Sequence, residues 1–231
     1  MPRKRHIHGG TEASSRSVYQ PDVTGDATAR YERLSHGGTT WYDLMPNPAN
    51  GTDGTIGAAF TWPNFNGESF VNIGNPTKLQ FTNNWSVTAW ASQDDAAPGS
   101  AFERLISRDN LGSRCFILSQ RDSDGFPFAG IFVGNSLKGI TGTHDYADNN
   151  WHHYMVTYDG TNLRLYVDGA LEGSIAPGGP MDNDPVDWEV GRAQNSAAYL
   201  EGRCDIVRFY NRTLSADEIL RDYYAGLPAH P

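Results

Sequence analysis

The polar residue with the clearest chemical consequence is Asp205, which opens the alternating apolar segment 205–210. Side chains of a β-strand alternate between its two faces, so Asp205 is predicted to share the core face with Val207 and Phe209. A carboxylate on that face costs several kcal/mol unless a partner or a cation neutralises it. The alternatives to a cation are backbone N–H groups or a nearby arginine, either Arg203 or Arg212.

A second candidate site lies on the loop that contains Arg192, Asn195 and Tyr199. Sugar sites place an aromatic ring against the apolar face of the sugar and polar groups near its hydroxyls. This combination predicts that the three residues bind a ligand. The six tryptophans also offer rings, but most are expected to pack in the core. His152 alternates with apolar residues of its strand and is predicted to be a core histidine.

Common catalytic patterns do not occur in the sequence. It contains no Gly-x-Ser-x-Gly motif, no Cys/His zinc spacing and no phosphate loop. A glycosidase needs two carboxylates beside the scissile bond. Asp187 and Glu189 share one face of a short segment. A catalytic pair of carboxylates from two separate strands is the alternative that the sequence leaves open. The sequence therefore predicts that the protein is not an enzyme.

The elements that must position these residues belong to an all-β protein. Of the 231 residues, 38% are hydrophobic and only 19% are charged, which excludes global disorder. The 25 glycines and 13 prolines indicate many turns between short strands. The net charge of -9 argues against a nucleic-acid partner, and no apolar run is long enough to span a membrane.

Two turns give the strongest local prediction. Asp159-Gly160 and Asp168-Gly169 each separate strand-like runs, and Asp-Gly favours a tight hairpin turn. The segments 151–158, 162–167 and 170–175 are therefore predicted to form an antiparallel meander. Further short strands at regular spacing predict a two-sheet jelly-roll sandwich. One short C-terminal helix is predicted after Ser215, which forms a capping box with Glu218.

Several of these motifs resemble a known family. The segments 150–169 and 202–215 resemble the central meander and the last strand of laminin G-like domains. Those domains belong to the concanavalin A-like lectin/glucanase jelly rolls. The front half is similar too, at Trp41-Tyr42-Asp43-Leu44, Phe65-Asn66-Gly67 and 85–90. The resemblance covers about residues 31–226 and implies the fold more than the function, since this fold hosts many functions.

The resemblance also implies a metal. Family members hold a structural calcium by an aspartate and by carbonyl groups of early loops, which correspond here to Asp205 and to the region of Asn66 and Gly67. Calcium accepts both kinds of oxygen. Related glucanases carry a Glu-x-Asp-x-x-Glu motif on one strand, and this sequence lacks it.

Residues 1–30 are predicted to form an extended N-terminal arm before the domain at 31–226 and a tail at 227–231. The arm carries Arg3, Lys4, Arg5 and Arg16 and shows no periodicity. It is interpreted either as a mobile tail or as a segment that docks on a neighbouring subunit of an oligomer or larger assembly. No signal peptide is seen. Cys115 and Cys204 are expected to be buried free thiols, with a bridge between them as the alternative.

We therefore expect a noncatalytic structural and binding protein. The first hypothesis is a subunit of a virion surface, such as a decoration, fibre or spike protein, because short laminin G-like proteins with a segment similar to 38–44 resemble those of phages. Its expected partners are other surface subunits and glycans. The alternatives are a secreted or surface carbohydrate-binding adhesion module and, last, a glycan-active enzyme.

Overall fold

A computed structural model describes the backbone of 29–32, 40–43 and 51–53 and the segments 64–93, 102–110, 112–121, 123–194 and 198–230. The predicted arm 1–30 therefore lies almost entirely outside the described residues and stays a prediction. The first strand begins at Ala29, close to the predicted domain boundary.

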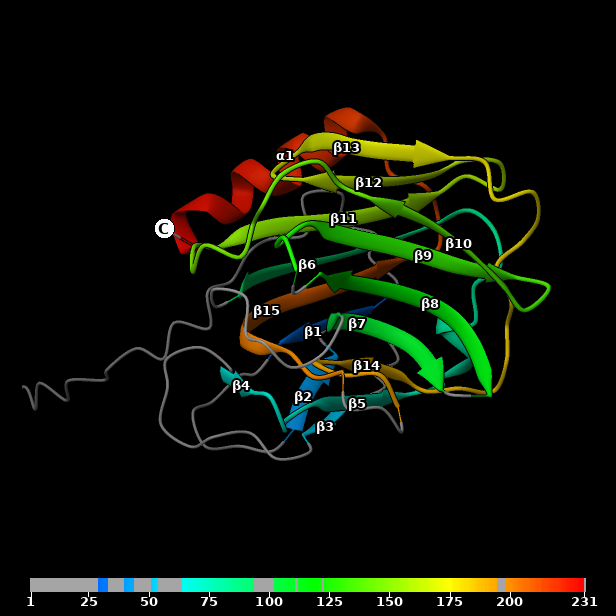
Figure 1. Cartoon of the computed structure of the whole chain (residues 1–231), viewed down its shortest axis with the longest axis horizontal. Helices are drawn as coiled ribbons and strands as arrows, with labels where there is room; N and C mark the ends of the chain where they lie inside the picture. Colours follow the sequence, from blue (N-terminus) through cyan, green and yellow to red (C-terminus); the bar gives the residue numbers. More distant parts are fainter. Residues whose placement is uncertain are drawn as a thin grey trace, which may run out of the picture.

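The described elements form an antiparallel β-sandwich (Figure 1), as the sequence predicted. The first sheet has the spatial order β13 (Ala170–Ile175), β12 (Leu163–Val167), β11 (His152–Tyr158), β6 (Trp85–Gln93), β15 (Glu201–Tyr210) and β1 (Ala29–Glu32). The short strand β4 (Asn64–Asn66) pairs with the start of β15.

The second sheet has the order β10 (Ser136–Thr141), β9 (Pro127–Val133), β8 (Ser113–Gln120), β7 (Glu103–Asn110), β14 (Trp188–Val190), β5 (Val71–Gly74), β3 (Gly51–Asp53) and β2 (Thr40–Asp43). Strand β2 also pairs with β1, which joins the two sheets along one edge. A short 3₁₀ turn, η1 (Thr77–Leu79), follows β5. Sequence analysis missed β10, whose burial pattern is mostly exposed and so lacks a clear apolar run.

The core lies between the inner faces of the two sheets. Alternate residues of each strand point into it, as the period of two requires. Three tightly packed aromatic rings, Trp85, Phe116 and Trp188, join the sheets; their neighbouring centroids are 5.5 and 5.3 Å apart. Cys115 and Cys204 are both buried and free, so the predicted thiols are confirmed and the alternative bridge is not formed.

The predicted meander and helix are confirmed. Asp168 and Gly169 both have positive φ, 51° and 79°, as a type I′ turn requires. Helix α1 (Ala216–Gly226) has the predicted capping box of Ser215 and Glu218. It continues into a 3₁₀ turn, η2 (Leu227–Ala229). Figure 1 shows α1 on the outside of the first sheet, above β12 and β13.

The helix covers the outer face of the first sheet through a small second core. Its members come from α1, from the segment before it and from the outward side of the strands: Met155, Tyr166, Tyr210, Leu214 and Ile219. The buried residues of α1 are Ile219, Asp222 and Gly226, whose spacing of three and four residues places them on one face of the helix, toward the sheet.

The predicted orientation of Asp205 is wrong. Ile206 has φ 46°, and the pairing of β15 with β6 shifts between Asp205 and Arg208, which is a β-bulge. The extra residue breaks the period of two, so Val207 and Phe209 keep the core face while Asp205 is opposite Trp90 on the outer face.

Candidate functional site

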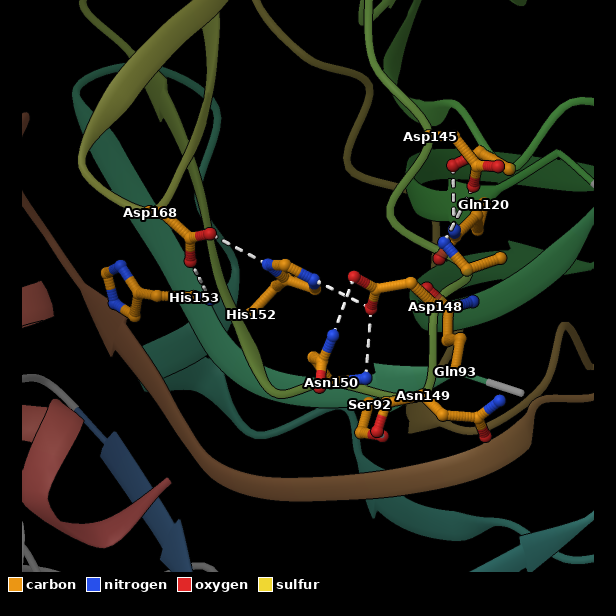
Figure 2. A network of polar contacts seen from close by, with 12 residues as sticks. Ser92, Gln93, Gln120, Asp145, Asp148, Asn149, Asn150, His152, His153 and Asp168 are labelled. Carbon is orange, nitrogen blue, oxygen red and sulfur yellow. Dashed lines mark hydrogen bonds and ion pairs between the residues drawn. The ribbon is translucent and has the colours of Figure 1, made fainter. Parts of the chain in front are cut away.

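The richest polar cluster of the described chain lies where the loop 142–151 meets the turn between β12 and β13. We call Asp148, Asn150, His152 and Asp168 the His152 cluster. Figure 2 shows the two aspartates on opposite sides of the imidazole ring, with Asn150 beside Asp148. His152 Nδ1 is 2.7 Å from Asp168 Oδ2, and His152 Nε2 is 3.1 Å from Asp148 Oδ1.

Local backbone geometry fixes both carboxylates. Asp168 occupies the left-handed position of the hairpin turn, and its Oδ1 accepts a hydrogen bond from the backbone N–H of His153 at 2.9 Å. Asp148 Oδ1 accepts the backbone N–H of Asn150 at 2.9 Å, and Oδ2 accepts the Asn150 amide at 2.8 Å. This local bonding pattern is typical of an aspartate that starts a turn. The carboxylates are thus held in place before any ligand arrives.

A third carboxylate, Glu172 on β13, contacts the same loop. Glu172 Oε2 accepts hydrogen bonds from the backbone N–H and the hydroxyl of Thr143, and Oε1 accepts the hydroxyl of Tyr146 at 2.7 Å. The ring of Tyr146 stands edge-on to that of His152, with centroids 4.9 Å apart. Tyr146 therefore connects Glu172 on β13 to the His152 cluster.

These contacts set the charges of the cluster. Burial alone would lower the pKa of His152, but the hydrogen bonds and charges of Asp168 and Asp148 raise it above its usual value. The pKa of Asp148 is lowered overall, because hydrogen bonds from Asn150 and His152 outweigh the opposing effect of burial. The arrangement favours a histidinium held between two carboxylates.

This arrangement is suited to holding groups in place and not to proton abstraction. A general base needs a free lone pair near the proton that it takes. Both ring nitrogens of His152 face carboxylate oxygens, and the imidazole fills the space between Asp148 and Asp168. Asp148 and Asn150 are exposed, so their outer oxygens and amide can meet hydroxyl groups of a ligand.

The charge state of His152 leads to a pH-dependent prediction. A raised folded pKa stabilises the fold fully below the unfolded value of about 6.5, and the stabilisation is lost as the pH rises through the folded pKa. We expect His152→Gln to lower the free energy of unfolding by about 1–2 kcal/mol near pH 5.5, and by clearly less near pH 9. Urea titrations of both proteins at the two pH values measure this difference.

His144→Gln is the matched control for this experiment. His144 is exposed and has a contact with Glu172. Its replacement is expected to change the stability by no more than about 0.5 kcal/mol at either pH. A destabilisation by His152→Gln that is equal at both pH values, or greater at pH 9, contradicts the assigned charge state.

The predicted position of His152 needs a correction. His152 lies at the end of β11, partly exposed and paired with two carboxylates, and is not a core residue. Its neighbour His153 is the fully buried histidine, and its Nε2 lies 3.2 Å from Asp222 Oδ2 on the outer face of the sheet. His152 does lie on the same side of β11 as Tyr154, as the alternation predicts. It is the first residue of the strand, however, and there the side of the sheet no longer decides how deeply a side chain is buried.

The predicted ligand-binding loop has a different character. Arg192 forms a forked ion pair with the fully buried Glu189, at 2.8 and 2.7 Å, and its guanidinium lies 3.2 Å above the centre of the Phe70 ring. Arg192 and Tyr199 are brought together as an isolated β-bridge. Asn195 lies outside the described residues. Since the guanidinium is already held by protein groups, a ligand-binding role for the loop stays a prediction.

The predicted calcium ligands do not converge in the structure. Asp205 Oδ2 lies 3.1 Å from His230 Nε2, and Oδ1 accepts the N–H of Ile206. Asn66 pairs with Glu201, four residues before Asp205 on β15 and so about 13 Å along the strand. The N–H of Gly67 donates to the carbonyl of Leu200. No group of three or more acidic, His or Cys side chains that could hold a metal occurs in the described segments, and calcium stays a prediction.

Sequence reasoning missed Asp148 and Asp168 as site residues. The sequence did single out Asp168, but only as the first residue of an Asp-Gly turn. Its contact with His152 depends on the register of β11 with β12, which the sequence does not reveal. Asp148 lies in a polar loop where nothing in the sequence separates it from Asp145. Only the spatial meeting of loop and turn identifies this pair.

Comparisons with known proteins agree with the fold. The model of the family described as the concanavalin A-like lectin/glucanases superfamily matches residues 65–220. No curated protein sequence matches the chain. The one helix and the short turns of the described chain include none long and apolar enough to cross a membrane.

Three solved structures illustrate the structural likeness. The binding domain of Paraclostridial Mosquitocidal Protein 1 is 15% identical with a TM-score of 0.68, covering 86% of this chain and 52% of that chain. Domain 4 of AbnA, a GH43 extracellular arabinanase from Geobacillus stearothermophilus in complex with arabinotriose, is 17% identical with a TM-score of 0.65, covering 86% and 98%. Trypanosoma rangeli sialidase in complex with the inhibitor DANA is 14% identical with a TM-score of 0.64, covering 84% and 32%.

These identities establish the fold alone. The chain spans about half the length of the toxin binding domain that it matches and about a third of the sialidase. Its size corresponds to the whole of domain 4 of the arabinanase.

Proposed function

Because the chain belongs to the concanavalin A-like lectin/glucanase superfamily, we propose that it is a noncatalytic binding protein whose ligand is a glycan. The observation that carries the noncatalytic part is the blocked imidazole of His152, with carboxylates at both nitrogens. Because the imidazole of His152 fills the space between Asp148 and Asp168, a scissile bond has no room between these two carboxylates. The complex of the similarly sized arabinanase domain with arabinotriose supports a glycan as the ligand.

We place the glycan at the His152 cluster and the adjoining ring of Tyr146. Fixed carboxylate and amide groups suit sugar hydroxyls, which donate and accept hydrogen bonds, and an aromatic ring suits the apolar face of the sugar. The loop, the turn and β13 carry four acidic residues, Asp145, Asp148, Asp168 and Glu172, against two histidines, His144 and His152. This excess of negative charge disfavours acidic sugars, so the proposed ligand is a neutral glycan.

A glycan array followed by calorimetric titration with the strongest neutral glycan tests this proposal. Asp148→Asn keeps the shape of the side chain but removes its charge, and we expect it to weaken binding about tenfold, the effect of one charged hydrogen bond. Asp217→Asn is the matched control, because Asp217 is an exposed acid on α1, and binding is expected to be unchanged.

The possible outcomes separate the ligand from its site. An array without any bound glycan contradicts the proposed function. Binding that is equally strong in the wild type and in Asp148→Asn contradicts the site at the His152 cluster. Preferred binding of sialylated or sulfated glycans contradicts the inferred neutral ligand.

The finer proposal is a role on the surface of a virion, with an extracellular adhesion module as the alternative. The virion role is supported by the basic residues of the segment 1–30, which complement an otherwise acidic chain. In this proposal the arm docks on a neighbouring subunit and the domain faces outward. Mass spectrometry of purified particles from cells that encode the chain tests it, and the absence of the chain from every particle contradicts it.

A further inference from the structure

Asp205 is a buried carboxylate that requires a counter-charge. It lies on the outer face of the first sheet, opposite Trp90 of β6, and is only 7% exposed. Its Oδ1 accepts the backbone N–H of Ile206 at 2.9 Å. One N–H group does not neutralise a charge that has lost most of its water, so a cation is needed beside Oδ2.

The two arginines that the sequence offered for this role are engaged elsewhere. Arg203 Nη2 donates to the hydroxyl of Ser92 at 2.6 Å and to the carbonyl of Asn149 at 2.9 Å. Arg212 forms a forked ion pair with Glu218, at 3.0 and 2.8 Å. Among the contacts of the described residues, neither arginine therefore supplies the counter-charge.

The cation beside Oδ2 is the ring of His230, the last described residue. His230 Nε2 lies 3.1 Å from Asp205 Oδ2, and its Nδ1 lies 3.0 Å from the carbonyl oxygen of Gly226. A carboxylate and a carbonyl both accept hydrogen bonds, so each ring nitrogen must carry a hydrogen for both bonds to form. A ring with two N–H groups is the positively charged imidazolium.

The surroundings of His230 favour a positive charge on its ring. The ring stacks on Trp90, with centroids 4.3 Å apart and planes within 6° of each other, and Trp151 lies edge-on at 4.9 Å. The face of an indole attracts a cation. Gly226 ends α1, and the carbonyl end of a helix carries a partial negative charge. Carboxylate, indole and helix end thus form a cation site that the chain fills itself.

A calcium ion, as implied by the family resemblance, would have to use the same carboxylate. Calcium takes about six to eight oxygen ligands, but both oxygens of Asp205 are already engaged by Ile206 and His230. Asn66 and Gly67 lie about 13 Å away along β15. The described segments therefore form no oxygen cage around Asp205, and a calcium ion would first have to displace the imidazolium.

We propose that the imidazolium of His230 takes the place at Asp205 that the family resemblance assigns to a calcium ion. The counter-charge then comes from the protein, and Asp205 needs no metal. The same contact attaches the end of the chain to the sheet, because Leu227 and Pro228 are exposed whereas His230 is buried. This inference does not depend on the proposed glycan.

A double-mutant cycle on the full chain tests the ion pair. His230→Phe keeps a flat ring for Trp90 but removes the charge and both N–H donors, and Asp205→Asn removes the opposite charge. Each variant is expected to raise the equilibrium constant of unfolding about 10- to 100-fold, the effect of one hydrogen bond between charged groups. The double variant is expected to lose no more than the more damaging single variant, because both changes remove the same interaction.

His144→Phe is the matched control for the cycle. His144 is an exposed histidine beside the carboxylate of Glu172, at 3.0 Å. Because exposed ion pairs contribute little, this variant is expected to change the equilibrium constant of unfolding less than about threefold.

Thermal melts with calcium and with chelator form the second arm of the test. About 10 mM calcium chloride exceeds the Kd of even weak calcium modules, and an ion that binds the folded state raises Tm. The wild type and Asp205→Asn are expected to respond identically to calcium chloride and to EDTA, since Asp205 holds no calcium in this proposal.

Two results overturn the proposal. One is a double variant whose loss is the sum of the two single losses, because His230 and Asp205 would then stabilise the fold independently. The other is a calcium-dependent rise in Tm that the wild type shows and Asp205→Asn lacks. If circular dichroism shows that His230→Phe disturbs the helix, His230→Ala replaces it in the cycle and the same criteria apply.

Discussion

Asp222→Ala is expected to lower the free energy of unfolding by about 3–5 kcal/mol, among the largest effects of any single substitution in this chain. Asp222 is fully buried between α1 and the first sheet. Its Oδ1 lies 2.7 Å from Nη1 of Arg208, which is also fully buried, and its Oδ2 lies 3.2 Å from His153 Nε2. Burial would raise the pKa of Asp222, but the charge of Arg208 and the bond from His153 lower it overall.

The expected cost arises from the charge that the substitution leaves behind. In Asp222→Ala the guanidinium of Arg208 stays in the interior without the carboxylate that faces it. Chemical denaturation measures the loss, and Asp217→Ala on the exposed side of the same helix is the control, with an expected change within about 0.5 kcal/mol. A loss below about 1 kcal/mol for Asp222→Ala contradicts the view that this ion pair attaches the helix.

Arg108→Met is expected to destabilise the fold by a similar amount, about 3–5 kcal/mol. Arg108 is fully buried on β7 and donates four hydrogen bonds to two separate segments, the loop after β5 and the loop before β14. The acceptors are the carbonyls of Val186 and Asp184 and the amide oxygens of Asn183 and Asn75, at 2.7–3.1 Å. Burial lowers the pKa of this arginine, which nearby acidic groups partly oppose.

Methionine keeps an unbranched, flexible side chain but is shorter and removes every donor. The four acceptors would then lose their partner, which costs most at the buried carbonyl of Val186 and at the half-buried Asp184 and Asn75, at about 1 kcal/mol for each hydrogen bond. Arg121→Met is the matched control, because Arg121 is half-buried and forms an ion pair with the half-buried Asp124 at a hairpin; its replacement is expected to cost less than about 1 kcal/mol. Equal denaturation midpoints for the two variants would contradict the assigned role of Arg108.

The parts of the fold that could be predicted from sequence are those with local causes. The hairpin at Asp168-Gly169 and the capping box at Ser215 each follow from residue types a few positions apart. The family resemblance added the jelly-roll architecture, and the matching family model confirms the family. Strand β10 was missed because its residues are mostly exposed and so give no strong apolar pattern.

The contacts of the site residues were less predictable because they depend on long-range register: Asp168 meets His152 only through the pairing of β11 with β12, and Asp205 depends on a bulge. The bulge at Ile206 places a β-branched residue at positive φ, which no local rule favours, and it reverses the face of Asp205. His230 reaches Asp205 from the end of the chain, and its ring stacks on Trp90 with centroids 4.3 Å apart. Neither the bulge nor the contact with His230 is indicated by the residues on either side of Asp205 in the sequence.

The order of strands in the first sheet has a consequence for biosynthesis. Strand β6 pairs with β15, which is made about 110 residues later. At about 5–20 residues per second, β6 waits roughly 5–20 s on the ribosome before its neighbour is complete. All nine residues of β6 are buried in the finished sheet. During translation this apolar strand therefore has an open edge, which is where a nascent chain is most exposed to mispairing and most in need of chaperones.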